Sequence, residues 1–335
     1  MRVLEVAREM GLLKIGTVAL DGTKIHANAS RHSAVSYEHA TKIEAQLKAE
    51  VAELMGRAEA ADQAEVVADG MSIPEELARR EARLAKLGAA KAKIEARAKE
   101  RFAQETAEYN AKLAAREAKA AATGKKPGGR PPAPPVEGPL PKDQINLTDE
   151  DSRIMPVAGG GFEQCYNAQA VVAAESLLVI APEVVQAPND KQQIAPMLEK
   201  IDALPEALGA VDTLLADSGY FSEANVTQCV AAEVEPLIAV GRESHHPSLR
   251  ERFAAAPPEP ENPTAVERMA WRLRTPQGKK LYGSRKQTPE PVFGIIKSVM
   301  GFRQFLLRSL DKVRGEWSLV TMAWNFKRMF VLSRG

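Results

Sequence analysis

The sequence predicts an α/β protein whose sheet is interrupted by a long, inserted antiparallel helical hairpin. An apolar strand is expected early, at 17–25, and further strands and helices follow residue 149 in the order βββαβαβ. Between them, residues 37–122 are rich in Ala, Glu, Lys, Arg and Leu, a composition typical of long, partly exposed helices. We therefore expect the helical segment to be inserted between the first and second strands.

The first predicted strand carries a single carboxylate. Residues 1–10 predict an amphipathic helix, and the apolar run between Gly16 and Gly22 predicts a strand with Asp21 at its end. An Asp that precedes a Gly is commonly a turn residue. Asp21 therefore has two interpretations, either a turn residue or a functional side chain at the end of a strand.

Two apolar stripes predict that the helical segment folds into a hairpin. One stripe runs from Ile43 to Leu54, and the other runs from Leu87 to Tyr109 at steps of seven or eight residues. The stretch 123–135 is rich in Pro and Gly and predicts an extended or disordered tether. The expected organisation is an opening helix and first strand at 1–34, the hairpin at 35–122, a linker at 123–145 and the remaining sheet domain at 146–335.

A second carboxylate follows a later strand. Strands are predicted at 166–172 and 177–185, and then Asp190–Gln193 resembles a capping box, so Asp190 is interpreted as a helix N-cap rather than a catalytic residue. The strand at 213–216 leads to Asp217 at a Gly-containing turn and repeats the pattern around Asp21. Ser222 begins the next helix, and another strand is expected at 235–241.

A third acid lies at the start of a late helix. Thr288–Lys297 predicts a helix with Glu290 in its first turn, where an acid also complements the helix dipole. Residues 302–308 alternate like a short strand. Residues 317–330 predict an amphipathic helix whose aromatic side chains we assign to the core rather than to nucleobase stacking, because they follow one helix face.

Charge and composition restrict the possible functions. The whole chain has a net charge of +1, yet residues 242–335 contain 18 Lys and Arg against 8 Asp and Glu, so this part is expected to face a polyanion. Cys165 and Cys229 are too few for a disulfide framework or a Cys-based zinc site and fit a reducing cytoplasm. No apolar run reaches membrane-spanning length. For His26 and His32 we expect loop or substrate-contact roles rather than zinc binding.

Asp21, Asp217 and Glu290 together fit metal-dependent chemistry on phosphodiesters. Two carboxylates on adjacent strands and a third on a helix packed beside them can hold two divalent cations about 3.5–4 Å apart. One cation would activate the attacking oxygen, and the other would stabilise the leaving oxygen.

At these residues the sequence resembles the DDE transposases of bacterial insertion sequences, which have a ribonuclease H-like catalytic fold. Residues 19–25 and 216–220 are similar to the strands that carry the family's first and second Asp, and residues 166–169 resemble the strand motif between them. The third-acid signature of related elements is a Tyr, a basic residue, a Glu and a Lys. Those places are filled here by Tyr282, Arg285 or Lys286, Glu290 and Lys297.

The resemblance covers most of the chain outside the hairpin, and it implies a ribonuclease H-like mixed sheet flanked by helices and a role for each residue. Asp21, Asp217 and Glu290 would be catalytic and would ligate two Mg²⁺ ions, with Mn²⁺ as a substitute. Water would make the first cut, and the 3′-hydroxyl of the element would then attack target DNA. The DNA-binding residues would be Tyr282, Lys297 and either Arg285 or Lys286.

The implied partners are double-stranded DNA, as element ends and as target, and a second copy of the chain in a homodimer on DNA. The implied location is the bacterial cytoplasm, at the nucleoid. Related transposases carry a helical N-terminal domain before the first Asp, so a chain that starts about twenty residues before Asp21 is expected to be truncated, with impaired end recognition. Two alternatives are an inactive DNA-binding or interaction remnant and a simple metal-dependent nuclease of the same fold.

Overall fold

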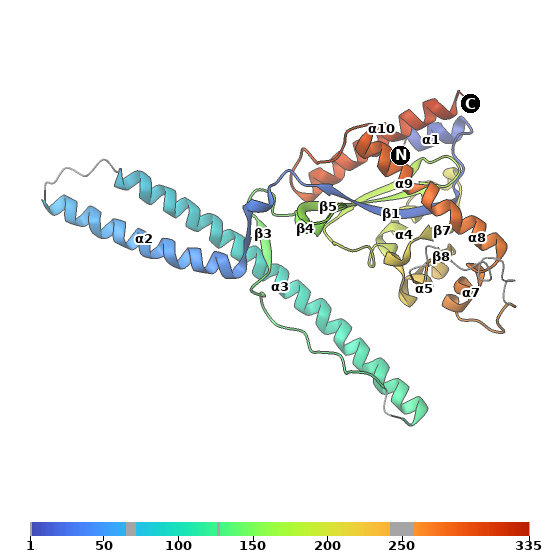
Figure 1. Cartoon of the computed structure of the whole chain (residues 1–335), viewed down its shortest axis with the longest axis horizontal. Helices are drawn as coiled ribbons and strands as arrows, with labels where there is room; N and C mark the ends of the chain where they lie inside the picture. The colour runs from blue at the N-terminus through green and yellow to red at the C-terminus, as the bar shows by residue number, and fades with distance from the viewer. Residues whose placement is uncertain (1, 65–71, 126–127, 242–257, 335) are drawn as a thin grey trace. The chain divides into compact units, whose positions relative to one another are not determined.

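The structure is a computed structural model that describes residues 2–64, 72–125, 128–241 and 258–334. The chain divides into two compact units, one formed by residues 1–30 with 151–335 and the other by residues 31–150 (Figure 1). Residues 126–127 of the predicted tether lie outside the described part. Among the helices that are described, none has the length and apolar character needed to cross a membrane.

The first unit is built on one mixed six-stranded sheet, which confirms the α/β prediction. The strand order is β4-β5-β1-β7-β8, and β6 also pairs with β5. The central strand β1 is antiparallel to β5 and parallel to β7. The strands are β1 (Gly16–His26), β4 (Arg153–Pro156), β5 (Phe162–Ala173), β6 (Val179–Val185), β7 (Val211–Ala216) and β8 (Glu235–Ile238).

Alternate residues of the central strands face two hydrophobic cores, one on each side of the sheet. On β5, Val171 and Ala173 belong to one core, while Ala170 and Val172 belong to the other. Helices flank the sheet (Figure 1) and contribute to both cores. The first core includes residues of α1 (Arg2–Glu9), α4 (Ile194–Asp202), α5 (Glu223–Ala231) and α7 (Ala265–Arg272), and the second includes residues of α9 (Pro289–Ser298) and α10 (Leu310–Leu332).

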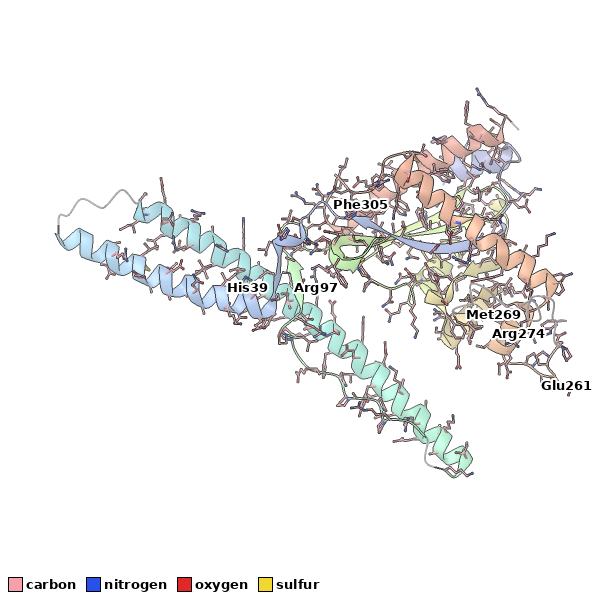
Figure 2. The ribbon with its side chains drawn as sticks, in the orientation of Figure 1. His39, Arg97, Glu261, Met269, Arg274 and Phe305 are labelled. Carbon is pink, nitrogen blue, oxygen red and sulfur yellow. The ribbon has the colours of Figure 1, made fainter. Side chains whose placement is uncertain are left out.

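The second core is rich in aromatic side chains. Phe305 is fully buried with its ring edge-on to Tyr166, the two centroids 5.7 Å apart (Figure 2). The strand predicted at 302–308 does not form, since Gln304 makes only an isolated bridge to His26. On α10 the buried Trp317 and Trp324 confirm the core assignment, but Phe326 and Phe330 are 53% and 57% exposed, so that prediction was only partly correct.

In the second unit, α2 (Tyr37–Ala64) and α3 (Ile73–Thr123) lie side by side and run in opposite directions (Figure 1). Glu44 pairs with Lys91 at 2.6 Å and Glu50 with Arg80 at 2.9 Å. The partner number on α3 falls as the residue number on α2 rises, which is the pairing expected of antiparallel helices. Buried apolar residues of both helices form a separate small core.

The second half of α3 extends past the start of α2 and packs against the Pro-rich segment. Arg116 donates hydrogen bonds to the carbonyl oxygens of Gly128 and Gly129, and Arg101 donates to Asp143 and to the Gly138 carbonyl. The described part of the Pro-rich segment therefore returns along the helix. Its end enters β3 (Gln144–Asn146), which pairs with β2 (Ala34–Ser36).

Candidate active site

Asp21 lies in the middle of β1, so the sequence interpretations that placed it in a turn or at a strand end were wrong. The strand continues through Gly22 to His26 because β5 pairs along its whole second half, with Ala170 opposite Asp21. On the other side, the parallel pairing with β7 sets Ala19 opposite Leu215. Asp21 lies two residues after Ala19 on β1, and Asp217 lies two residues after Leu215, directly past the end of β7, so both acids follow the last paired residues of adjacent parallel strands.

Asp217 follows β7 directly and caps the short 3₁₀ helix η3 (Ser218–Tyr220). Its Oδ1 atom accepts a hydrogen bond from the Gly219 N–H at 2.8 Å. Ser222 then caps α5, as the sequence predicted, by accepting from the Asn225 N–H at 3.1 Å. The two caps fix the direction in which the chain leaves the strand, and thereby the position of the Asp217 carboxylate.

Arg285 bridges Asp21 and Glu290. It is buried in the 3₁₀ helix η4 (Ser284–Gln287), and its Nη1 atom lies 3.7 Å from Asp21 Oδ2 while its Nη2 atom lies 3.3 Å from Glu290 Oε1. Glu290 stands in the first turn of α9 and is half exposed, so this contact ties an outer carboxylate to the central strand. Lys286, the other candidate for the basic position, is exposed.

Lys297 and Tyr282 also contact the region of the central strand β1. Lys297 Nζ donates to Thr23 Oγ1 at 2.5 Å and to the Lys24 carbonyl at 2.8 Å, just beyond Asp21. Burial lowers the pKa of Lys297 below its usual value. Tyr282 lies on α8 (Pro276–Gly283) and packs against the buried cluster that contains Ala19 of β1 and residues of β7 and β8.

The surroundings of Asp21 favour a nearby positive charge. The pKa of Asp21 is raised to about 7, chiefly by burial and also by the negative charges of Asp217 and Asp190, while the Gly22 N–H and Arg285 oppose the rise. The Asp21 side chain is only 18% exposed. Ionised Asp21 therefore needs a cation beside it, and Arg285 supplies part of that charge.

Asp190 is not the N-cap of α4, so the capping-box prediction was wrong. The helix begins at Ile194, and Asp190 Oδ1 instead accepts hydrogen bonds from the side-chain amides of Asn167 and Gln169, each at 2.7 Å. Lys24 Nζ lies 3.9 Å from the same oxygen. Sequence reasoning overlooked a signal for this cluster, since Asn167 and Gln169 are polar at alternate positions and the residues 170–173 that follow them on the strand are all apolar.

Within the described ranges, no three His, Cys, Asp or Glu side chains are grouped as a metal site. Around Asp21, Arg285 contacts both Asp21 and Glu290. Asp21 and Asp217 nevertheless offer carboxylate oxygens, the ligands that a hard divalent cation prefers. Asp21 in particular is held where its ionised form is poorly compensated.

A cavity of about 860 Å³ lies elsewhere, at the opposite end of β7 from Asp217. Val211, at the start of the strand, lines it together with residues of α4 and α5, and its charged lining is acidic, formed by Glu199, Asp202, Glu206, Asp212 and Glu233. Negative charge does not suit a nucleic-acid backbone. Its lining residues do not include Asp21, Asp217 or Glu290, so the candidate site is separate from this cavity.

Gly22 has no room for a side chain. A Cβ atom at this position would lie 2.2 Å from Gln169 Nε2 and 2.7 Å from Asp190 Oδ1. We expect Gly22→Ala to lower the free energy of unfolding by about 1–3 kcal/mol, because overpacking displaces either these side chains or the strand that carries Asp21. Urea unfolding measures this change. Gly315→Ala, on α10 where a Cβ meets open space, is the control and should be neutral or stabilising; equal stability of the two variants would contradict the prediction.

A family model described as Transposase DDE domain matches residues 142–326, more than half of the chain. The chain therefore belongs to the family of transposase DDE domains. The matched range contains Asp217 and Glu290 but begins after Asp21, which joins the site through the pairing of β1 with β5 and β7. Neither a curated protein nor a solved structure matches the chain.

Proposed function

We propose that the chain is a DNA transposase with a ribonuclease H-like catalytic domain, which cuts phosphodiester bonds at the ends of an insertion sequence and joins them to target DNA. The observation that supports this proposal is that Asp21 lies on β1 and Asp217 directly follows the adjacent parallel strand β7, in a chain of the DDE family. Glu290, tied to Asp21 through Arg285, is the third acid. The hairpin of α2 and α3 is then an insertion between β1 and β4, which follow each other along the chain among the strands of the six-stranded sheet.

The family implies divalent cations, and oxygen ligands are available for them. We propose that Asp21 and Asp217 hold Mg²⁺, or Mn²⁺ in its place, and that Glu290 becomes a ligand when Arg285 releases it. Two bound cations would activate the attacking oxygen and stabilise the leaving oxygen of the phosphodiester. Arg285 meanwhile supplies part of the positive charge beside Asp21, and burial leaves the Asp21 carboxylate little exposed to bulk water.

The residues proposed to contact DNA differ in their surroundings. Lys286 is exposed and free to reach a phosphate, whereas Arg285 is buried against the carboxylates, so we assign the phosphate contact to Lys286. Lys297 and Tyr282 lie beside β1, where DNA would meet the acids. Exposed basic residues of α7 and α8 and the turn between them extend this surface, namely Arg268, Arg274 (Figure 2), Lys279 and Lys280. A homodimer on DNA and a location at the nucleoid complete the proposal.

A cleavage and joining assay tests the proposal. The protein is incubated with Mg²⁺ or Mn²⁺ and labelled DNA taken from the flanks of its own gene, which would contain the element ends. We expect metal-dependent cleaved and joined products, reduced at least 10²-fold or so by Asp217→Ala, since the loss of one charge-stabilising group has about this effect. Asp212→Ala changes an exposed Asp on the same strand and should leave the products unchanged.

The same assay separates the alternatives. Cleavage without joining would favour a nuclease of the same fold. The absence of any metal-dependent product from the wild-type chain would favour an inactive DNA-binding remnant.

A further inference from the structure

A chain of hydrogen bonds joins η3 to β5 and to Asp190. The Tyr220 hydroxyl donates to Gln169 Oε1, and the Gln169 amide donates to Asp190 Oδ1 at 2.7 Å. The Asn167 amide donates to the same oxygen of Asp190 at 2.7 Å. We refer to Asn167, Gln169, Asp190 and Tyr220 as the amide network.

Each end of the amide network touches the chain next to a proposed catalytic acid. At one end, Gln169, Asp190 and Asn167 press against Gly22, since a Cβ there would lie 2.2–2.8 Å from an atom of each. At the other end, Tyr220 belongs to the 3₁₀ helix that Asp217 caps. Asn225 fastens this end as well, because its side-chain amide donates to the carbonyl oxygens of both Tyr220 and Lys191, the residue after Asp190.

The amide network lies beyond the point where the hydrogen-bonded pairing of β1 with β7 ends. The pairing of β1 with β7 extends only to Ala19 and Leu215, two residues before Asp21 and Asp217. No ladder pairing between these strands then sets the separation of the two carboxylates. Asn167, Gln169 and Tyr220 are each buried, and a buried set of hydrogen bonds favours one arrangement of the segments that it joins.

We infer that Asp190, Gln169 and Tyr220 are positioning residues that hold the segments of Asp21 and Asp217 at the separation needed to share a metal site. This inference rests on the proposed function, which makes Asp21 and Asp217 the metal ligands. The three residues act through the backbone of Gly22 and through η3. Groups that orient metal ligands in this way commonly contribute 10–100-fold to metal affinity.

Direct Mn²⁺ binding to the full, metal-free chain tests the inference without DNA. Tyr220→Phe removes one hydroxyl and no charge, and we expect it to weaken Mn²⁺ binding about tenfold in titration calorimetry. Asp190→Asn should weaken binding at least as much, since it also removes a negative charge near Asp21. Wild-type affinity in Tyr220→Phe would overturn the inference.

Two matched variants in the second unit control for the loss of a hydrogen bond alone. Tyr37→Phe removes the hydroxyl that donates to Glu95 at 2.8 Å. Asp143→Asn changes a carboxylate that is 20% exposed, against 25% for Asp190, and that accepts from Arg101 and from the Leu140 N–H. Both controls should keep wild-type Mn²⁺ affinity, and an equal loss in them would also overturn the inference.

A second measurement is independent of metal. In urea unfolding of the metal-free chain, Tyr220→Phe and Asp190→Asn should together shift the midpoint by less than the sum of their separate shifts, because both interrupt one network through Gln169. Additive shifts would overturn the inference. If the wild-type chain binds no Mn²⁺, the proposed function fails, while this comparison still decides whether the network couples the two segments.

Discussion

Replacing Asp21 with Asn should stabilise the metal-free protein above pH 7 and abolish metal-dependent cleavage. The pKa of Asp21 is about 7 in the folded chain, mainly because of burial, and an unfolded Asp titrates near pH 4. Between these pH values the folded chain binds a proton that the unfolded chain has released, so stability falls as the pH rises from about 4 to 7. Asn does not titrate, so the stability of Asp21→Asn should not fall in this way as the pH rises.

The size of the effect follows from the shift in pKa. Each unit corresponds to about 1.4 kcal/mol, so we expect Asp21→Asn to be more stable than wild type by about 2–4 kcal/mol at pH 8, with the difference vanishing toward pH 4. Urea unfolding followed by Trp fluorescence measures this difference in the free energy of unfolding. The signal reports on the unit that contains the sheet, because Trp271, Trp317 and Trp324 all lie in it.

Two further samples make this first test specific. Asp212→Asn alters an exposed carboxylate on β7 and should follow the wild-type pH dependence. Added Mn²⁺ should stabilise wild type but not Asp21→Asn above pH 7, because a ligand that binds only the folded state raises its stability. Parallel stability curves for wild type and Asp21→Asn across this pH range would refute the account of the site.

Arg285→Ala and Lys286→Ala should affect different properties although the residues are neighbours. Arg285 is buried beside Asp21 and Glu290, so its removal leaves Asp21 without its nearest cation. We expect Arg285→Ala to lower the free energy of unfolding by about 2–3 kcal/mol at pH 8, and by less at pH 5.5, where Asp21 is protonated. Unchanged stability at pH 8 would contradict the bridging role.

Lys286→Ala is the matched variant for that comparison. Because Lys286 is exposed, its loss should change stability by no more than about 0.5 kcal/mol. If Lys286 contacts a phosphate, the variant should bind DNA more weakly, and the slope of log affinity against log salt concentration should become shallower by about one. Fluorescence anisotropy over a range of salt concentrations measures this slope. If Lys286→Ala keeps the wild-type slope, Lys286 does not contact a phosphate, and Arg285 becomes the candidate for that contact.

The parts of the fold that the sequence predicted are those set by local periodicity. The strands at 166–172 and 213–216 and the late helix over Glu290 were recognisable because apolar residues recur at strand or helix spacing. The strand at 302–308 failed because alternation alone does not supply a pairing partner, and only Gln304 finds one. On α10, periodicity identified the helix but not how much of its surface the sheet covers, so Phe326 and Phe330 were assigned to the core incorrectly.

The three candidate acids could be proposed from the sequence, but their contacts could not. Asp21, Asp217 and Glu290 stood out because each is a carboxylate at a recognisable place in a strand or helix. Asp190 was misassigned because the local pattern of a capping box is the same whether the carboxylate caps a helix or accepts from distant amides. In the folded chain, the Asp190 carboxylate accepts hydrogen bonds from the side-chain amides of Gln169 and Asn167 on β5, which are 21 and 23 residues away in sequence.

By itself, the sequence determined the α/β class, the order of strands and helices over residues 153–238, and the family to which three of its acids point. These properties depend on residue type and on spacing within single segments of the chain. The tertiary structure alone decided that Asp21 lies within a strand, that Arg285 rather than Lys286 compensates it, and that Asp190 joins the site. Each of these depends on burial and strand register between segments far apart in the chain, and neither quantity exists until the sheet has formed.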